Sequence, residues 1–265
     1  MSPAGGRQAR SGRSAGASSP LQAYLRETAS PLGAAALTLP LLAVHGLGTI
    51  FAPEVRNGAD LVTVGLDAAF RAADLRGATP WAAFYGVVAL IQAGLVAWLA
   101  SRGRLAAQWL VPFFLECASY AVICGVLSGL ATHHLLDALT TPTVRIAVPL
   151  AAAAAPIGGL DAVLISFGAG FHEELVFRLG AMAGLGRRFG GEGWRRQPGL
   201  LLALWLGSAV VFSAAHHLVE PWSLGAFVFR TAMGLLFGGL FLVRGFATAA
   251  WSHALYDIWV LVVAG

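Results

Sequence analysis

The chain has 265 residues, of which 57% are apolar and only 11% are charged. A soluble domain averages about 25% charged residues, so this composition excludes a fold whose whole exterior is wet. The net charge of +4 comes from 17 arginines against 13 acidic residues. The arginines cluster at the ends of apolar runs, which indicates membrane topology and argues against a nucleic-acid partner.

Residues 1–20 are small, polar and basic, and we expect a disordered basic tail there. They lack the apolar core that a cleavable signal peptide has directly after its basic stretch. Cations that are all arginine, together with abundant alanine and glycine, are typical of a GC-rich genome. We therefore expect a bacterial chain in the inner (plasma) membrane with a cytoplasmic N-terminus.

A helix needs roughly 20 apolar residues to cross the hydrocarbon layer. Runs of that length lie at about 32–52, 80–100, 109–131, 159–185, 200–218, 224–243 and 246–264. The run 143–157 is short and lies between two prolines, so it is a half-span, an interfacial helix or an eighth crossing. An eighth crossing would move the arginines at 187–196 outside, against the positive-inside tendency. We predict an all-α, polytopic transmembrane helix bundle of about seven spans, with eight as the alternative.

The loop at 53–79 has a weak helical period around LVTVGLDAAFRAADL, so we expect a short amphipathic helix at the outer surface. Residues 21–142 are then N-terminal transmembrane helices with this outer loop, and residues 143–265 form a separate membrane core. Cys117 and Cys124 are seven apart in one apolar run. That spacing predicts packing residues on one helix face and no disulfide.

Ionisable side chains inside membrane helices are costly, so they usually have a partner or a function. The N-terminal runs carry His45 and Glu116, which we interpret as cavity-facing or packing groups. The C-terminal half concentrates such groups: His172, Glu173, Glu174, Arg178, His216, His217, Arg230, His253 and Asp257. This asymmetry predicts an active site among the C-terminal helices.

In FHEELVFRLG, residues 171–180, the spacing predicts different roles for the neighbouring carboxylates Glu173 and Glu174. Glu174 and Arg178 are four apart on one helix face, so we expect them to form a structural ion pair. Glu173 is rotated from Glu174 by about 100°, which leaves it able to face a cavity as a general base.

Histidines follow on two later predicted spans. In VFSAAHH, residues 211–217, His216 and His217 are adjacent, so at most one of them faces the same cavity as Glu173. In HALYD, His253 and Asp257 are four apart on one face. The carboxylate there can fix the imidazole tautomer or accept a hydrogen bond from substrate.

These segments resemble the motifs of the CPBP family, the CAAX-processing type II prenyl endopeptidases and their bacteriocin-processing relatives. EELVFR is similar to the family's EExxxR motif, FSAAH to its FxxxH motif and HALYD to its HxxxN/D motif. All three occur in the family's order within about 85 residues. The resemblance covers roughly 145–265, and the N-terminal helices match only in hydrophobic character.

The resemblance implies an intramembrane endopeptidase in which Glu173 activates a water molecule with help from His216. His253 and Asp257 would stabilise the oxyanion or orient the scissile peptide, supported by the Glu174–Arg178 pair. Many family members have asparagine where this chain has Asp257. A carboxylate cannot donate to an oxyanion unless it is protonated, so we expect Asp257 to orient His253 or to bind a substrate N–H group.

A metal-dependent mechanism is the alternative, because Glu173, His216 and His253 could bind Zn²⁺ with an open position for water. The chain has no HExxH motif, since Val176 stands where its second histidine would be. A count of ~1.5 Å per residue from the inner helix ends puts His253 roughly 10 Å shallower than Glu173. Tilted helices or shifted boundaries must close that gap if the three side chains share a site.

Three functions are compatible with the residues. The one we favour is an endopeptidase for a peptide or membrane-protein substrate, such as a prenylated CAAX protein, a leader peptide, a C-terminal sorting tail or a bacteriocin precursor. The second is a catalytically silent binding or immunity protein of the same fold. The third is an ion-coupled transporter, for which the expected internal repeat is not visible in the sequence.

Overall fold

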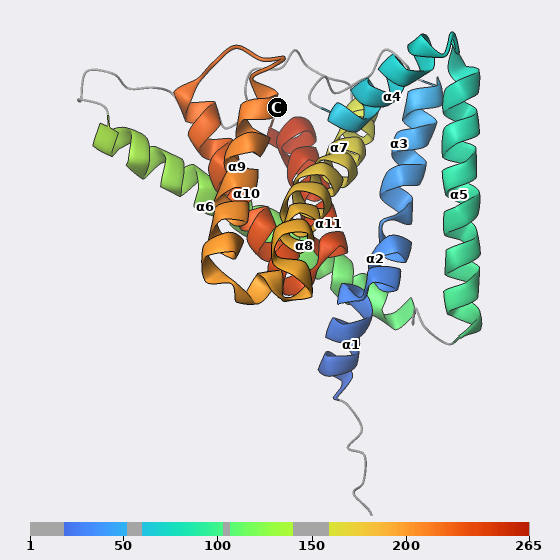
Figure 1. Cartoon of the computed structure of the whole chain (residues 1–265), viewed down its shortest axis with the longest axis horizontal. Coiled ribbons are helices and arrows are strands. Elements are labelled where there is room, and N and C mark those ends of the chain that lie inside the picture. Colours follow the sequence, from blue (N-terminus) through green and yellow to red (C-terminus); the bar gives the residue numbers. More distant parts are fainter. Residues whose placement is uncertain (1–18, 52–59, 103–106, 140–158, 265) are drawn as a thin grey trace, which may run out of the picture.

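The computed structural model describes residues 19–51, 60–102, 107–139 and 159–264, and this part of the chain consists of helices without strands. The helices are α1 (Pro20–Ala29), α2 (Pro31–Leu37), α3 (Leu39–Phe51), α4 (Leu61–Ala72), α5 (Ala78–Ser101), η1 (Ala107–Trp109), α6 (Leu110–Leu139), α7 (Gly159–Glu174), η2 (Leu175–Gly184), α8 (Leu185–Gly190), η3 (Gly191–Arg196), α9 (Pro198–His216), α10 (Leu224–Arg244), α11 (Phe246–Ile258) and η4 (Trp259–Ala264). The predicted all-α bundle is confirmed (Figure 1). The possible crossing at 143–157 and nearly all of the predicted tail lie outside the described residues, and α1 already begins at Pro20.

Five helical segments are long and apolar enough to cross a membrane: Pro31–Phe51, Ala78–Ser101, Ala107–Ala138, Pro198–His216 and Leu224–Arg244. The other two predicted runs are helical as well. One is the continuous helix formed by α7, η2 and α8, and the other is α11 with η4. The chain is therefore an integral membrane protein, as its composition predicts.

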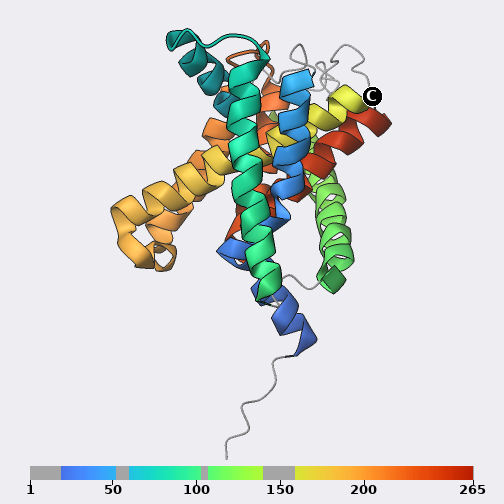
Figure 2. The ribbon, with the colours of Figure 1, turned by 90° about the vertical axis from the view of Figure 1, so that its right-hand side faces the viewer.

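The long helices form a bundle around α7 and α11, which pack directly against each other. α9 and α10 lie side by side on one flank of this pair, and α3 and α5 lie side by side on the other (Figures 1 and 2). α6 runs obliquely past α10 and α11 and is steeply inclined to α5 (Figure 1). Its 30 residues span about 45 Å at 1.5 Å per residue. This exceeds the roughly 30 Å hydrocarbon thickness and allows a strongly tilted crossing.

Close helix contacts depend on small residues, as is usual in membrane bundles. A Cβ atom at Gly170 of α7 would lie 2.6 Å from the carbonyl oxygen of Ala250 and 2.7 Å from Cβ of Ala254, both on α11. Gly245 separates α10 from α11 with a φ of 92°, a backbone conformation that favours glycine. These two glycines allow α11 to turn back sharply and to lie tightly against α7.

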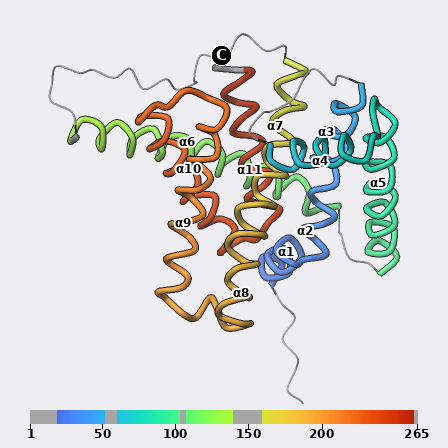
Figure 3. Tube along the Cα trace, turned by 45° about the horizontal axis from the view of Figure 1, so that its top comes forward, coloured from blue at the N-terminus to red at the C-terminus, as the bar shows by residue number. Residues whose placement is uncertain are grey.

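A helix also forms in the loop between the first two predicted spans. The side chain of Asp60 caps α4, because its Oδ1 accepts hydrogen bonds from the backbone N–H groups of Val62 and Thr63. Figure 3 shows α4 lying across the bundle between α7 and α5. Its position at the outer membrane surface stays a prediction.

Glu116 of α6 has the packing role that its isolated position suggests. Its carboxylate accepts two hydrogen bonds from Arg244 at the end of α10, at 2.6 and 2.8 Å, and another from the Tyr24 hydroxyl of α1. The network joins three helices that are distant in sequence. Cys117 and Cys124 are both buried and free, as their spacing predicts.

Candidate active site

The two adjacent glutamates stand where α7 changes from α- to π-helical geometry. Glu173 and Glu174 are the last residues of α7, and the π-helix η2 begins at Leu175. Glu173 has 3% of its surface exposed and Glu174 none. π-Helical segments are rare and frequently mark functional sites, because they displace side chains from the regular helical register.

Glu174 and Arg178 form the ion pair that their spacing predicts. Arg178 Nε lies 3.0 Å from Glu174 Oε2, and neither side chain is exposed. The guanidinium carbon is also 5.2 Å from the ring centre of Phe212 on α9, within the range of a cation–π contact. The pair thereby connects the helix that carries Glu173 to the helix that carries His216.

Glu173 meets one histidine from each of the two other motif-bearing helices. Its Oε2 lies 3.7 Å from His216 Nε2 on α9 and 3.9 Å from His253 Nε2 on α11. Both separations exceed direct hydrogen-bonding distance and are short enough for one bridging water molecule. The residues of the three motifs, far apart in the sequence, therefore converge on one buried place, which we call the Glu173 site.

The hydrogen bonds of the two imidazoles determine which nitrogens face Glu173. His216 Nδ1 is 2.9 Å from the backbone carbonyl of Phe212, and His253 Nδ1 is 3.0 Å from Glu174 Oε1. A carbonyl or an ionised carboxylate can only accept, so each Nδ1 carries the hydrogen. In the neutral form, both rings then present the lone pair of Nε2 to the Glu173 site.

The support of His253 differs in one respect from the expectation. Asp257 Oδ2 is 3.6 Å from His253 Nε2, so it lies near the ring without forming its orienting hydrogen bond. That bond comes from Glu174, and the ring of Phe237 on α10 stacks on the imidazole at 4.7 Å. Glu174 therefore contacts both Arg178 and His253, and the role of Asp257 stays a prediction.

The predicted difference in depth does not separate His253 from Glu173. Figure 2 shows the α7–η2–α8 helix running obliquely through the bundle. A count along a tilted helix overstates the depth of its residues, which explains why Glu173 seemed to lie deeper than His253. The short separation between their side chains shows that both belong to one site.

The remaining polar residues of the C-terminal half lie outside the Glu173 site. His217 Nδ1 is 3.3 Å from the Pro221 carbonyl, and its ring packs on Trp222. Arg230 pairs with Glu220 at 2.5 Å, a partner that the sequence analysis did not identify. His172 bonds to Asp60, a loop residue that hydropathy and motif spacing gave no reason to select.

The donor atoms of the Glu173 site fit a zinc ion in their chemistry. One carboxylate oxygen and two imidazole nitrogens are ordinary zinc ligands, and each imidazole already uses its other nitrogen as a hydrogen-bond donor. The separations of 3.7 and 3.9 Å each join Glu173 to one histidine. The ligand atoms of Glu173, His216 and His253 are not among the described groups that lie within 4.8 Å of one another, so the donors fit zinc in chemistry and are not gathered as closely as a metal site requires.

Comparison with known proteins gives an independent assignment. The family model "Type II CAAX prenyl endopeptidase Rce1-like" matches residues 155–259. No curated protein and no solved structure matches the chain significantly. The matched segment contains all three motifs and every residue of the Glu173 site. The match of residues 155–259 to a protease family therefore supports the resemblance to the CPBP family.

Proposed function

We propose that the chain is an intramembrane endopeptidase whose catalytic groups are Glu173, His216 and His253. The observation that carries the proposal is the approach of Glu173 Oε2 to the Nε2 atoms of both histidines within the protease-family segment. Peptide hydrolysis needs an activated water and stabilisation of the developing oxyanion. A water molecule within reach of Glu173 and His216 meets the first need.

The reaction then proceeds through a tetrahedral intermediate. Glu173 takes a proton from the water as the hydroxide oxygen bonds to the scissile carbonyl carbon. The carbonyl oxygen becomes an oxyanion, and a protonated His253 donates a hydrogen bond to it from Nε2. When the C–N bond breaks, the proton held by Glu173 passes to the leaving amine, with His216 as the nearby relay.

The other residues position these groups. Glu174 holds His253 through Nδ1, and the Arg178 guanidinium neutralises the second oxygen of Glu174. Asp257 is placed to accept a hydrogen bond from a substrate N–H group at the edge of the site. A Zn²⁺ cofactor would be held by Glu173, His216 and His253 and would supply Lewis-acid polarisation of the substrate carbonyl.

The substrate is a peptide segment that reaches the site within the membrane. Prenylated CAAX proteins, leader peptides, C-terminal sorting tails and bacteriocin precursors all present such a segment. The proposal places the protein in a bacterial inner membrane with its N-terminus in the cytoplasm.

The test compares membrane proteomes of cells that produce the wild type, Glu173→Gln and Glu192→Gln. Glu192 is exposed in η3, so its substitution is the matched control for loss of a carboxylate. We expect mass spectrometry to find new peptide termini with the wild type and Glu192→Gln, and to lose them with Glu173→Gln. Retention of these termini by an inserted, folded Glu173→Gln protein would refute the proposal.

A protein with no cleavage products in any of the three strains would instead be the silent binding protein of the same fold. A purified protein that moves ions across liposomes in a Glu173-dependent manner would support the transporter.

A further inference from the structure

A second group of buried ionisable side chains lies between α3, α4 and α7. His45, Asp60 and His172 are 8%, 1% and 3% exposed, and they form what we call the His45–Asp60–His172 triad. Asp60 Oδ2 is 2.8 Å from His172 Nδ1 and 3.8 Å from His45 Nε2. The two imidazole rings meet edge to face, with their centres 4.9 Å apart. One ligand atom from each residue lies within 4.8 Å of the other two.

The lone pair of His45 Nε2 points into this group. His45 Nδ1 is 3.3 Å from the Leu164 carbonyl, so the hydrogen of a neutral ring sits on Nδ1. The hydroxyls of Thr63 and Thr49 lie near Nε2, and each has a shorter bond to another acceptor. Thr63 donates to Asp60 Oδ2 at 2.7 Å, and Thr49 donates to the His45 carbonyl at 3.1 Å. Nε2 is 3.3 Å from the Thr63 hydroxyl oxygen and 3.5 Å from that of Thr49, which is longer in each case than the bond that the hydroxyl makes to its other acceptor.

Within the described part of the chain, the triad also holds a buried carboxylate without a permanent cation. Among the described residues, the groups that pair with Asp60 are the two histidines, and no arginine does so. A buried charge is costly unless it is paired or coordinates a metal. A divalent cation would satisfy both the carboxylate charge and the imidazole lone pair.

The separations suit a small transition-metal ion. Ligand atoms about 2.0–2.1 Å from a tetrahedral zinc ion lie roughly 3.3 Å from one another. The observed 2.8 and 3.8 Å fall on either side of that value, so shifts of about half an ångström would bring both separations from Asp60 to it. Two imidazoles and one carboxylate select zinc-like ions over Mg²⁺ or Ca²⁺, which prefer oxygen ligands.

The neighbouring helices hold the ligands in place. Asp60 uses Oδ1 to cap α4, which directs Oδ2 at the histidines. A Cβ atom at Gly168 of α7 would lie 2.3 Å from His45 Nδ1, so the absence of a side chain there lets the ring lie on α7. Gly168 is one helical turn before His172, on the same face of α7.

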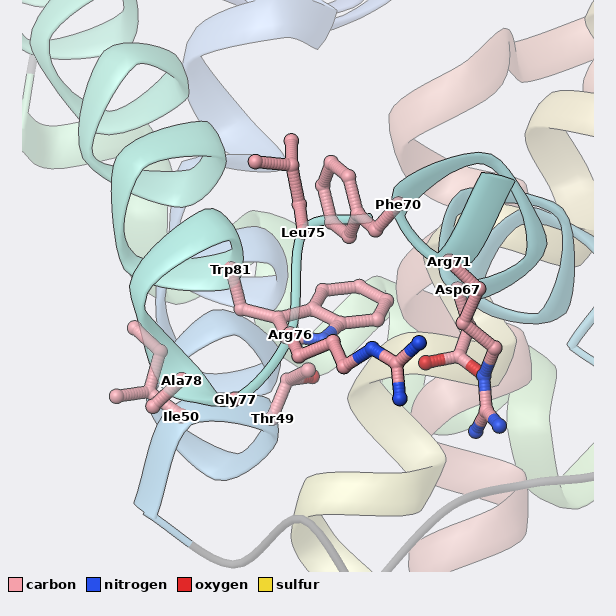
Figure 4. Close-up of a pocket in the computed structure, with 10 residues that line it drawn as sticks. All are labelled: Thr49, Ile50, Asp67, Phe70, Arg71, Leu75, Arg76, Gly77, Ala78 and Trp81. Carbon is pink, nitrogen blue, oxygen red and sulfur yellow. The ribbon is translucent and has the colours of Figure 1, made fainter. Parts of the chain in front are cut away.

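A surface pocket lies beside the triad and shares Thr49 with its surroundings. Its volume is about 670 Å³, and it lies between α3, α4 and α5. Figure 4 shows Arg76 reaching between Trp81 and Asp67 in this pocket, with Thr49 also lining it. The hydroxyl of Thr49 is 3.5 Å from His45 Nε2, so one residue of the pocket wall contacts this nitrogen.

We propose that His45 Nε2, Asp60 Oδ2 and His172 Nδ1 bind one Zn²⁺ ion, separate from the Glu173 site. The ion replaces the hydrogen between His172 and Asp60, and a neutral His172 then carries its proton on Nε2. A water molecule or the Thr63 hydroxyl takes the fourth position. The bound ion clamps α3 and α4 onto α7 at the residue next to Glu173.

The test measures zinc bound to the full chain in detergent micelles. The protein is stripped with a chelator, exposed to Zn²⁺, desalted and assayed by mass spectrometry of the metal. We expect the wild-type chain to bind zinc, and Asp60→Asn and His45→Gln each to bind one zinc fewer per chain. Asp60→Asn can keep the cap of α4, because the asparagine oxygen still accepts hydrogen bonds.

Two controls locate the ion. Asp74→Asn changes an exposed carboxylate on the same loop and should retain one zinc. Glu173→Gln removes a possible ligand of the other site and should also retain one zinc, whether or not the chain cleaves peptides. A stripped wild-type protein that takes up no zinc overturns the proposal, and so does a folded Glu173→Gln protein that binds none. An undiminished zinc count in both folded triad variants overturns it as well.

Discussion

Substitution of Gly170 by alanine tests whether the fold itself positions the Glu173 site. The added Cβ would lie 2.6 to 2.8 Å from three atoms of α11, among them the backbone nitrogen of Ala254. Ordinary van der Waals contact begins near 3.4 Å, so α7 and α11 must separate by about 0.6–0.8 Å. Two of the three atoms belong to the backbone, which means that a change of rotamer cannot relieve the contact.

The expected loss follows from what these two helices carry. His253 is adjacent to Ala254, and its 3.0 Å hydrogen bond to Glu174 would lengthen beyond the usual limit. Overpacking of this kind costs about 1–3 kcal/mol of stability. A displacement approaching 1 Å at a catalytic constellation lowers turnover by roughly tenfold to a hundredfold.

The assay compares Gly170→Ala with Gly129→Ala in detergent. Gly129 is on α6, and a Cβ there would meet nothing within 4 Å, so this variant is the matched control. Unfolding by titration with a denaturing detergent gives stability, and cleavage of a substrate identified by the proteome comparison gives turnover. Wild-type turnover and stability in Gly170→Ala would show that the α7–α11 distance does not control the site.

Three further predictions concern Glu174, Glu173 and Glu116. Glu174→Gln leaves Arg178 as an uncompensated buried charge and should cost about 3–5 kcal/mol of stability. The double variant with Arg178→Met should recover most of this loss. Equal stability of the single and double variants in denaturing-detergent titrations would contradict this prediction. Glu173→Gln should abolish cleavage with little loss of stability in the same titration, and a large destabilisation would indicate a structural role instead. Glu116→Gln should destabilise the chain by about 1.5–3 kcal/mol, because it weakens the charge-assisted hydrogen bonds from Arg244; unchanged unfolding would show that this contact is dispensable.

The sequence predicts the helical runs because crossing a bilayer requires long apolar segments, and this pattern is visible without any tertiary information. It also predicts the Glu174–Arg178 pair, since both residues lie on one helix within one turn. The convergence of Glu173 with His216 and His253 was expected from the ordered motifs and not from hydropathy. The helical depth count even argued against it, because tilt cannot be read from a single sequence.

Contacts between residues far apart in the chain could not be predicted from the sequence. Asp60 and His172 are 112 positions apart, and Arg244 and Glu116 are 128 apart. His45 seemed isolated in its run because its partners lie on α4 and α7. Which residues meet depends on helix tilt and rotation, and these are set by side-chain packing across the whole bundle.

Three consecutive residues of α7 have different partners because successive side chains on a helix point about 100° apart. His172 faces Asp60, Glu173 faces His216 and His253, and Glu174 faces Arg178 and His253. Such a segment is stable in a membrane only if packed protein surrounds it, because each of these groups would be costly in lipid. Burial of all three residues fits this requirement. Substitutions at the three positions should therefore have different effects. We expect loss of the proposed zinc at position 172, loss of the proposed cleavage at 173 and loss of stability at 174.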